Sequence, residues 1–184
     1  AQRTLTTLHG RLDLPFLKPV FKTFPEMPLV SISNHQRTPF PRANWVGTVY
    51  HGLPTNLLPY KENPSWDYLA FLGRICPEKG IDRAIRIAKR VGMKLKIAAK
   101  IDKVDQKYFE DEIQPLLDDP LIEFVGEVGD KDKAAFLGNA YAVLFPICWP
   151  EPFGLVMIES MACRAPDGAF RCGSVPEVND HGVS

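Results

Sequence analysis

The fold of this chain is decided by one stretch, Tyr68-Leu-Ala-Phe-Leu-Gly-Arg-Ile-Cys-Pro-Glu-Lys-Gly80, followed directly by Ile81-Asp-Arg-Ala-Ile-Arg-Ile-Ala88. It begins with a short apolar run that is typical of a strand covered on both faces. It continues with apolar residues at three- and four-residue steps, which predict an amphipathic helix over 80–91. A covered strand that leads into such a helix is the repeating unit of a parallel α/β sheet.

The same alternation continues toward the C-terminus. Further strands are predicted at 94–99, 122–125 and 142–146, and further helices at 106–117, 131–139 and 153–163. Four strand and helix units predict a Rossmann-like parallel sheet with helices on both faces. Ligands of open parallel sheets bind beyond the carboxyl ends of the strands, so the site residues are expected there.

The residues that precede this region have a different character. Eight prolines between Pro15 and Pro59 divide the chain into short pieces, which excludes long helices. Short strands are predicted at 4–8, 29–33 and 45–50, with one helix within 14–24. The proline-rich stretch over 53–67 predicts a linker. We therefore predict a partial N-terminal α/β domain with its linker over residues 1–63 and a second Rossmann-like domain, incomplete at its C-terminus, over 64–184.

Composition excludes several classes of protein. With 184 residues, of which 45% are hydrophobic, the chain can bury a core and is not a disordered protein. Because 22 Lys and Arg balance 22 Asp and Glu, the net charge does not call for nucleic acid as a partner, and any anion site must be local. No apolar run approaches the roughly 18 residues of a membrane span, and the first residues do not show a charged region followed by an apolar core, so we expect no signal sequence. We expect a cytoplasmic protein without an integral membrane segment, and its four cysteines, which lack Cys-x-x-Cys spacing, to be reduced thiols.

Two cations follow the first strand of the second domain. Arg74 and Lys79 lie between the end of that strand and the start of the next helix, where side-chain cations can hold a phosphate. Their spacing does not match a P-loop. The alternative, that both are solvated surface charges, stays open.

A second cluster follows the strand at 142–146, in Glu151-Pro-Phe-Gly-Leu-Val-Met-Ile-Glu159. Pro152 is expected in the first turn of a helix, where its missing N–H removes no hydrogen bond. The backbone amides of Phe153, Gly154 and Leu155 are then expected to face an anion.

Carboxylates bracket this helix start. Glu159 lies about 7.5 Å along the helix from Gly154, close enough to hold the hydroxyls of a ribose whose phosphate lies at the helix end. The alternative is that Glu151 only favours the positive end of the helix and that Glu159 faces solvent. The sequence has no Asp-x-Asp or His/Asp grouping for Mg²⁺ or Zn²⁺, so we expect neither a metal nor a cofactor.

These stretches resemble the two main motifs of the family 4 retaining glycosyltransferases of the GT-B fold. The first corresponds to Phe71-Leu-Gly-Arg-Ile-Cys-Pro-Glu-Lys-Gly80 and the second to the Glu-x7-Glu signature from Glu151 to Glu159. Gly173-Ser-Val-Pro-Glu-Val178 is similar to a further family run. The resemblance implies metal-independent transfer, with retention, of a hexose from a nucleoside-diphosphate sugar, expected to be UDP-linked, to an unknown acceptor.

The resemblance also implies roles for individual residues. Arg74 and Lys79 would bind the donor diphosphate and stabilise the leaving group, Glu159 would hold the ribose, and Glu151 would hold the transferred sugar. Backbone groups of the segment from Val125 to Val128 are similar to those that hold the base.

One histidine resembles a further family position. His9, in Thr7-Leu-His-Gly10, is similar to a histidine that faces the donor sugar from the N-terminal domain. The alternative, that His9 is an ordinary loop residue, stays open.

The chain departs from the family pattern at the end of the second cluster. Family members have Ala-Cys-Gly-Thr-Pro, where this chain has Ala162-Cys-Arg-Ala-Pro166. If that position is left-handed, Arg164 costs about 1–2 kcal/mol, and Asp167 in a covered strand would add a desolvation penalty.

The chain also resembles a family member shortened at both ends. The second hypothesis is therefore a truncated nucleotide-sugar-binding module with little or no transferase activity and a tendency to self-associate. A sugar-nucleotide epimerase of similar fold is a third hypothesis, which the Glu-x7-Glu pattern disfavours.

Overall fold

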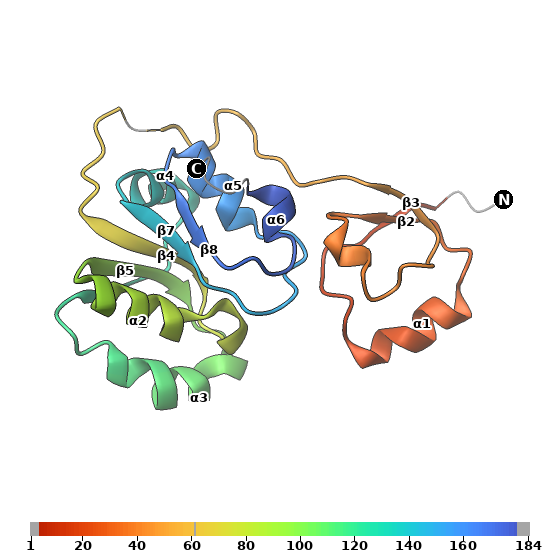
Figure 1. Cartoon of the computed structure of the whole chain (residues 1–184), viewed down its shortest axis with the longest axis horizontal. Coiled ribbons are helices and arrows are strands. Elements are labelled where there is room, and N and C mark those ends of the chain that lie inside the picture. Colours follow the sequence, from red (N-terminus) through yellow and green to blue (C-terminus); the bar gives the residue numbers. More distant parts are fainter. Residues whose placement is uncertain (1–3, 61, 180–184) are drawn as a thin grey trace. The chain divides into compact units, whose positions relative to one another are not determined.

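The computed structural model describes residues 4–60 and 62–179, and it divides into two compact units (Figure 1). The first unit contains the residues up to Gly52 and two later segments, Trp149–Leu155 and 171–179. The second unit contains Leu53–Cys148 and Val156–Phe170. The domain boundary expected at residues 63 and 64 stays a prediction.

The second unit is built on a five-stranded sheet. Its strands are β4 (Tyr68–Arg74), β5 (Lys94–Lys100), β6 (Ile122–Gly126), β7 (Ala142–Phe145) and β8 (Asp167–Ala169). All neighbouring strands are parallel, in the order β6-β5-β4-β7-β8. The chain runs outward from β4 to β6 and then returns to β7 on the other side of β4. The predicted Rossmann-like parallel sheet is confirmed, and its strand order reverses between β4 and β7.

Helices cover both faces of this sheet. Figure 1 shows α2 (Ile81–Val91) and α3 (Gln106–Tyr108) on one side, and α4 (Asp130–Gly138) and α5 (Leu155–Ala162) on the other. Such an arrangement is expected of this strand order, because right-handed crossovers that proceed in opposite directions from β4 place their helices on opposite faces. The predicted apolar stripe of α2 is buried against the sheet, through Ile81, Ala84, Ile85 and Ala88.

The helix predicted over 106–117 is not continuous. The α-helical turn of α3 passes into a π-helical turn over Phe109–Ile113 and a 3-10 turn over Gln114–Leu116. Pro115 explains the change, because proline lacks the backbone N–H that the helix requires and its ring collides with the preceding turn. The apolar spacing still buries Ile113 completely.

The short strand β8 includes Asp167, the residue for which a desolvation penalty was expected. Its carboxylate is only half-buried and accepts a hydrogen bond from the buried Ser160 hydroxyl on α5. A bonded, half-buried carboxylate loses less solvation than a fully buried one. The penalty is therefore smaller than the sequence suggested.

The first unit contains a smaller sheet of three parallel strands in the order β1-β2-β3. The strands are β1 (Thr6–Thr7), β2 (Leu29–Ser31) and β3 (Trp45–Thr48), and the helices are α1 (Lys18–Thr23) and α6 (Val175–Val178), with 3-10 turns at Pro15–Leu17 and His35–Arg37. The strands and α1 lie within their predicted ranges, and the strands are shorter than predicted. No helix among the described residues is long and apolar enough to cross a membrane.

Candidate functional site

The carboxyl ends of β4 and β7 mark the candidate site. The two strands are parallel neighbours, with Leu69 opposite Ala142 and Ala70 opposite Val143, so both end at the same edge of the sheet. The chain leaves β4 toward one flank of the sheet and leaves β7 toward the other. In doubly wound sheets, this reversal opens the crevice in which ligands bind.

Arg74 is the last residue of β4, and it belongs to a small charged group at this edge. Its guanidinium Nη1 donates to Asp102 Oδ2 at 3.3 Å, and Lys100 Nζ lies 3.0 Å from Asp102 Oδ1. The hydrogen bond to Asp102 raises the pKa of Arg74, and the bonds from Lys100 and Arg74 lower the pKa of Asp102. Two cations share the Asp102 carboxylate, and the charges of Asp105 and Glu127 also act on Arg74 and Lys100.

Lys79 points toward the neighbouring strand. Its Nζ lies 5.6 Å from the ring centroid of Phe145, the last residue of β7, at a distance that permits a cation–π contact. The loop after β4 therefore carries a guanidinium at its start and an ammonium that reaches the end of β7. Both predicted cations lie at the reversal of strand order.

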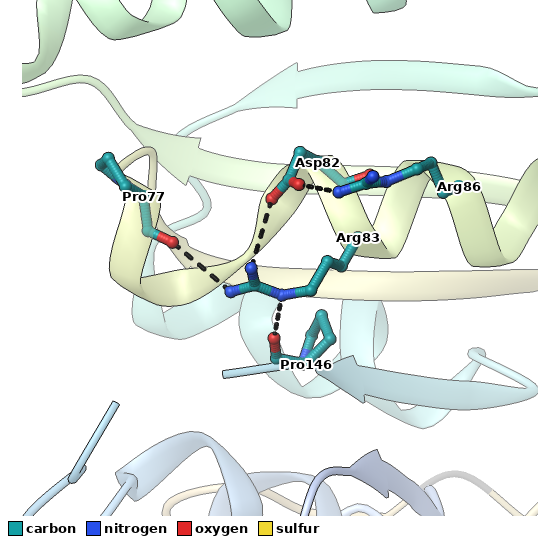
Figure 2. Close-up of polar contacts among 5 residues, drawn as sticks. All are labelled: Pro77, Asp82, Arg83, Arg86 and Pro146. Atoms are coloured by element: carbon teal, nitrogen blue, oxygen red, sulfur yellow. Dashed lines mark hydrogen bonds and ion pairs between the residues drawn. The ribbon is translucent and has the colours of Figure 1, made fainter. Parts of the chain in front are cut away.

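A glycine and an arginine fasten this loop to the end of β7. Gly80 has a left-handed backbone with φ of +72°, and a Cβ there would lie 2.4 Å from the Pro146 carbonyl oxygen. Figure 2 shows Arg83 Nε donating to that same oxygen, at 2.7 Å, and Nη2 directed at the Pro77 carbonyl, at 3.5 Å. The loop that carries Lys79 is thus held in place by backbone packing and a charged donor.

Sequence reasoning missed Arg83. It reads as one more cation on the polar side of α2, and its acceptor lies 63 residues away. Only the pairing of β4 with β7 brings the two together, so no local signal could have identified it.

Glu159 lies on α5 and is mostly buried. Its side chain is 13% exposed, and its Oε1 lies 2.9 Å from Nζ of Lys133, on α4. The alternative that Glu159 faces solvent is wrong, because the lysine holds the carboxylate inside the second unit. Burial opposes the charge of Lys133, but its contacts with Glu159 and Asp130 outweigh this and raise its pKa. Lys133 was not predicted.

Glu151 belongs to the first unit and is buried, with 8% exposure. Its carbonyl accepts the N–H of Ser174 at 3.0 Å, and a Cβ at Gly173, where φ is +61°, would lie 2.5 Å from its backbone nitrogen. Ser174 Oγ also donates to the carbonyl of Phe153 at 2.8 Å. The segment that begins the Glu-x7-Glu pattern is thereby fixed against residues 173–174.

The start of α5 differs from the prediction. The helix begins at Leu155, so the placement of Pro152 in its first turn is wrong. The physical reason is Gly154, whose φ of +82° is left-handed and cannot continue into a right-handed helix. The chain turns at Gly154 and becomes helical one residue later. Anion binding by the amides of Phe153, Gly154 and Leu155 stays a prediction.

The remaining predicted residues are His9 and the segment from Val125 to Val128. The His9 ring stacks on His51 in the first unit, with centroids 5.2 Å apart. Burial, and then the charge of His9, lowers the pKa of His51. Val125 lies in β6 and Val128 in the loop that leads to α4. Neither observation tests the roles that the resemblance implies.

The second unit holds five of the predicted residues, namely Arg74, Lys79, Val125, Val128 and Glu159, with Arg74 at the end of β4 and Lys79 in the loop that follows it. The first unit holds Glu151, Phe153, Gly154, Leu155 and His9. The predicted convergence of both sets on one ligand stays a prediction. In the part of the chain that the structure describes, no three His, Cys, Asp or Glu side chains are grouped so as to hold a metal ion.

Comparison with known sequences finds a family match. Residues 59–184 match the family described as glycosyl transferases group 1. An uncharacterized glycosyltransferase of Methanocaldococcus jannaschii is 32% identical over 120 residues, which cover 63% of this chain and 30% of that protein. A second uncharacterized glycosyltransferase from the same organism is 27% identical over 132 residues, which cover 71% of this chain and 35% of that protein. The matched stretch is thus about a third of the length of these curated relatives.

Solved structures agree on the fold. Anabaena HepE in complex with UDP and glucose has a TM-score of 0.83 at 20% identity, over 97% of this chain and 56% of that one. Sucrose-phosphate synthase from Thermosynechococcus elongatus has a TM-score of 0.74 at 20% identity, over 93% and 51%. At this identity the likeness shows the fold alone, which is that of GT-B glycosyltransferases.

Proposed function

Since this chain belongs to the glycosyl transferases group 1 family, we propose that it binds a nucleoside-diphosphate sugar and takes part in transferring the hexose to an acceptor. The proposal includes retention at the transferred carbon and no requirement for a metal ion. The observation that carries it is the pair of cations, Arg74 and Lys79, on one loop at the reversal of strand order. A diphosphate is the ligand whose charge fits that pair.

The chemistry needs stabilisation of a leaving group. When the bond from sugar to phosphate breaks, its electron pair stays on the phosphate oxygen, so the nucleoside diphosphate departs with about one additional negative charge, and fixed cations favour that state. The contact of Gly80 with Pro146 and the hydrogen bond from Arg83 hold the loop before any ligand arrives. Less reorganisation is then needed during the reaction, which is the advantage of a preformed electrostatic site.

The nucleoside part of the donor would be held by Glu159. A carboxylate can accept hydrogen bonds from two adjacent hydroxyls, and Lys133 Nζ contacts Oε1 of the Glu159 carboxylate at 2.9 Å. The complexes of HepE with UDP and with UDP-glucose support UDP as the nucleotide. Base binding by the backbone from Val125 to Val128 belongs to the same proposal.

The residues of the first unit have roles that the resemblance supplies. Glu151 would bind the transferred sugar, and the amides of Phe153, Gly154 and Leu155 would contact the diphosphate. His9 would face the donor sugar. The rigid backbone around Glu151 and Ser174 supports a fixed position for the Glu151 carboxylate.

Calorimetric titration with UDP and UDP-glucose in EDTA tests binding. Arg74→Ala and Lys79→Ala should each weaken UDP binding about 10- to 100-fold, because each removes a charge-assisted contact to phosphate. Arg86→Ala is the matched control, since its side chain is 69% exposed on α2 and pairs with Asp82. Binding that is unchanged in both variants, or no heat with any nucleoside diphosphate at millimolar concentration, contradicts the proposal.

Transfer is tested separately, because the chain matches only part of the length of its relatives. This observation favours a second candidate, a module that binds the donor without transferring the sugar. Release of UDP from UDP-glucose in EDTA, abolished by Glu159→Ala, supports transfer. UDP binding without any release, across a panel of sugar acceptors, supports the binding module.

A further inference from the structure

We propose that Lys133 is a positioning residue that orients the Glu159 carboxylate for recognition of the ribose diol. The inference rests on the proposed function, because it concerns the nucleotide site. It assigns a role to a residue outside both sequence motifs.

Two helices on the same side of the five-stranded sheet supply the pair (Figure 1). Lys133 is the fourth residue of α4, which begins two residues after Val128, and Glu159 lies on α5. The side chains are 19% and 13% exposed, and Nζ lies 2.9 Å from Oε1. The lysine also approaches the exposed carboxylate of Asp130, at 3.4 Å. A single ammonium therefore connects the start of α4 to the carboxylate on α5.

Glu159 is surrounded on its own helix by buried residues, so its contact with Lys133 affects how well the carboxylate is accommodated there. Met157, Ser160 and Cys163, on the same helix and at its end, are buried. The thiol of Cys163 has a raised pKa, through burial and then the negative charge of Glu159. A carboxylate in such surroundings loses part of its hydration, and a cation or hydrogen-bond donors are needed to compensate for that loss. Lys133 supplies that compensation.

The geometry also fixes the direction of the carboxylate. A Glu side chain has several rotamers, and a hydrogen bond from Nζ to Oε1 selects among them. A vicinal diol requires acceptor oxygens at fixed positions, so a carboxylate free to rotate would bind it less well. Lys133 would contribute to diol recognition without touching the nucleotide.

Stability alone does not account for the pair. Replacing a buried ion pair by apolar residues of similar volume is often neutral or stabilising. The helix α5 is otherwise apolar over most of its length, so an apolar residue at position 159 would suit its packing. An ion pair in this mostly buried place is explained if the Glu159 carboxylate has a function. Lys133 then offsets the cost of burying that carboxylate.

The test compares two ligands in four variants of the whole chain. Calorimetry measures Kd for UDP and for 2′,3′-dideoxy-UDP, which lacks the diol, and the ratio of the two isolates diol recognition. We expect the wild-type chain to prefer UDP at least tenfold and Glu159→Gln to lose most of that preference. Lys133→Met should reduce the preference several-fold, and Lys133→Arg should restore at least half of it. Lys131→Met, an exposed lysine on the same helix, should match the wild-type chain.

The outcomes separate this inference from the proposed function. If the wild-type chain binds neither ligand, the proposed function fails. If it prefers UDP and Glu159→Gln removes the preference while Lys133→Met retains it, the proposed function stands and the role of Lys133 is overturned. Thermal denaturation establishes that each variant is folded. Should Lys133→Met not fold, Lys133→Ala takes its place, because it removes the hydrogen bond to Glu159 without adding a long apolar side chain, and a full preference for UDP in that variant also overturns the role.

Discussion

The two ends of α2 have nearly the same backbone and very different surroundings. Gly80, before the helix, has φ of +72°, and Gly92, after it, has φ of +69°. A Cβ at Gly80 would lie 2.4 Å from the Pro146 carbonyl oxygen, whereas a Cβ at Gly92 would have no atom within 4 Å. Gly92 ends a helix, as glycines often do. Gly80 allows the loop after β4 to pack against the backbone at the end of β7, at the candidate site. Of the two glycines, only Gly80 therefore bears on the site.

Replacing Gly80 by Ala should have the largest effect. The left-handed backbone costs an alanine about 1–2 kcal/mol, and the collision with a backbone oxygen adds about 1–3 kcal/mol, because neither strand end can move freely. We expect the free energy of unfolding in urea to fall by about 2–5 kcal/mol and UDP binding to weaken with it.

The control for this prediction is Gly92→Ala. It imposes the same left-handed strain without a collision, so it should lower the free energy of unfolding by only about 1–2 kcal/mol and leave UDP binding unchanged. If the two substitutions lower the free energy of unfolding equally, the close contact of Gly80 with Pro146 does not contribute to the stability.

Substitution of Arg83 removes a side-chain contact at the start of α2 and leaves the backbone of Gly80 unchanged. Arg83→Ala leaves the Pro146 oxygen without its guanidinium donor, which should cost about 1.5–3 kcal/mol of stability. We expect weaker UDP binding as well, because the loop that carries Lys79 is no longer held by the hydrogen bond from Arg83 to the Pro146 carbonyl. The variant Arg83→Lys should recover little, since an ammonium cannot contact the Pro146 and Pro77 carbonyls as a planar guanidinium does.

Arg86→Ala, one turn further along α2, is the control for Arg83. Its ion pair with Asp82 is exposed, so its loss should change stability by less than about 0.5 kcal/mol. A UDP affinity that is the same in Arg83→Ala and Arg86→Ala would contradict the positioning role of Arg83.

The sequence predicted α2 and its apolar face well, because both are properties of neighbouring residues. It also identified Arg74 and Lys79, since a local motif places them at a strand end. It could not identify Arg83 or Lys133, because their partners lie 63 and 26 residues away and only the strand order brings them together.

Two local predictions failed for reasons of backbone geometry. The helix after β7 was predicted to begin near Pro152, but a left-handed Gly154 delays it to Leu155. A continuous helix was predicted over 106–117 from its apolar spacing alone. Pro115 interrupts the α-helical hydrogen bonding there, and the chain continues as π-helical and 3-10 turns. Apolar periodicity locates a helix more reliably than it locates the helix ends.

Arg164 is the left-handed position without a glycine that the sequence indicated, and its φ of +59° confirms the expectation. Its guanidinium lies 3.7 Å from the ring centroid of Tyr60, a cation–π contact that offsets part of the strain. Arg164→Gly removes about 1–2 kcal/mol of strain and loses about 0.5–1 kcal/mol of contact. We expect a net gain of up to about 1.5 kcal/mol in the free energy of unfolding, opposite in sign to the effect of Gly80→Ala. In a Tyr60→Ala background the gain should be larger, because no contact is left to lose, and an equal gain in both backgrounds would show that the ring contributes nothing.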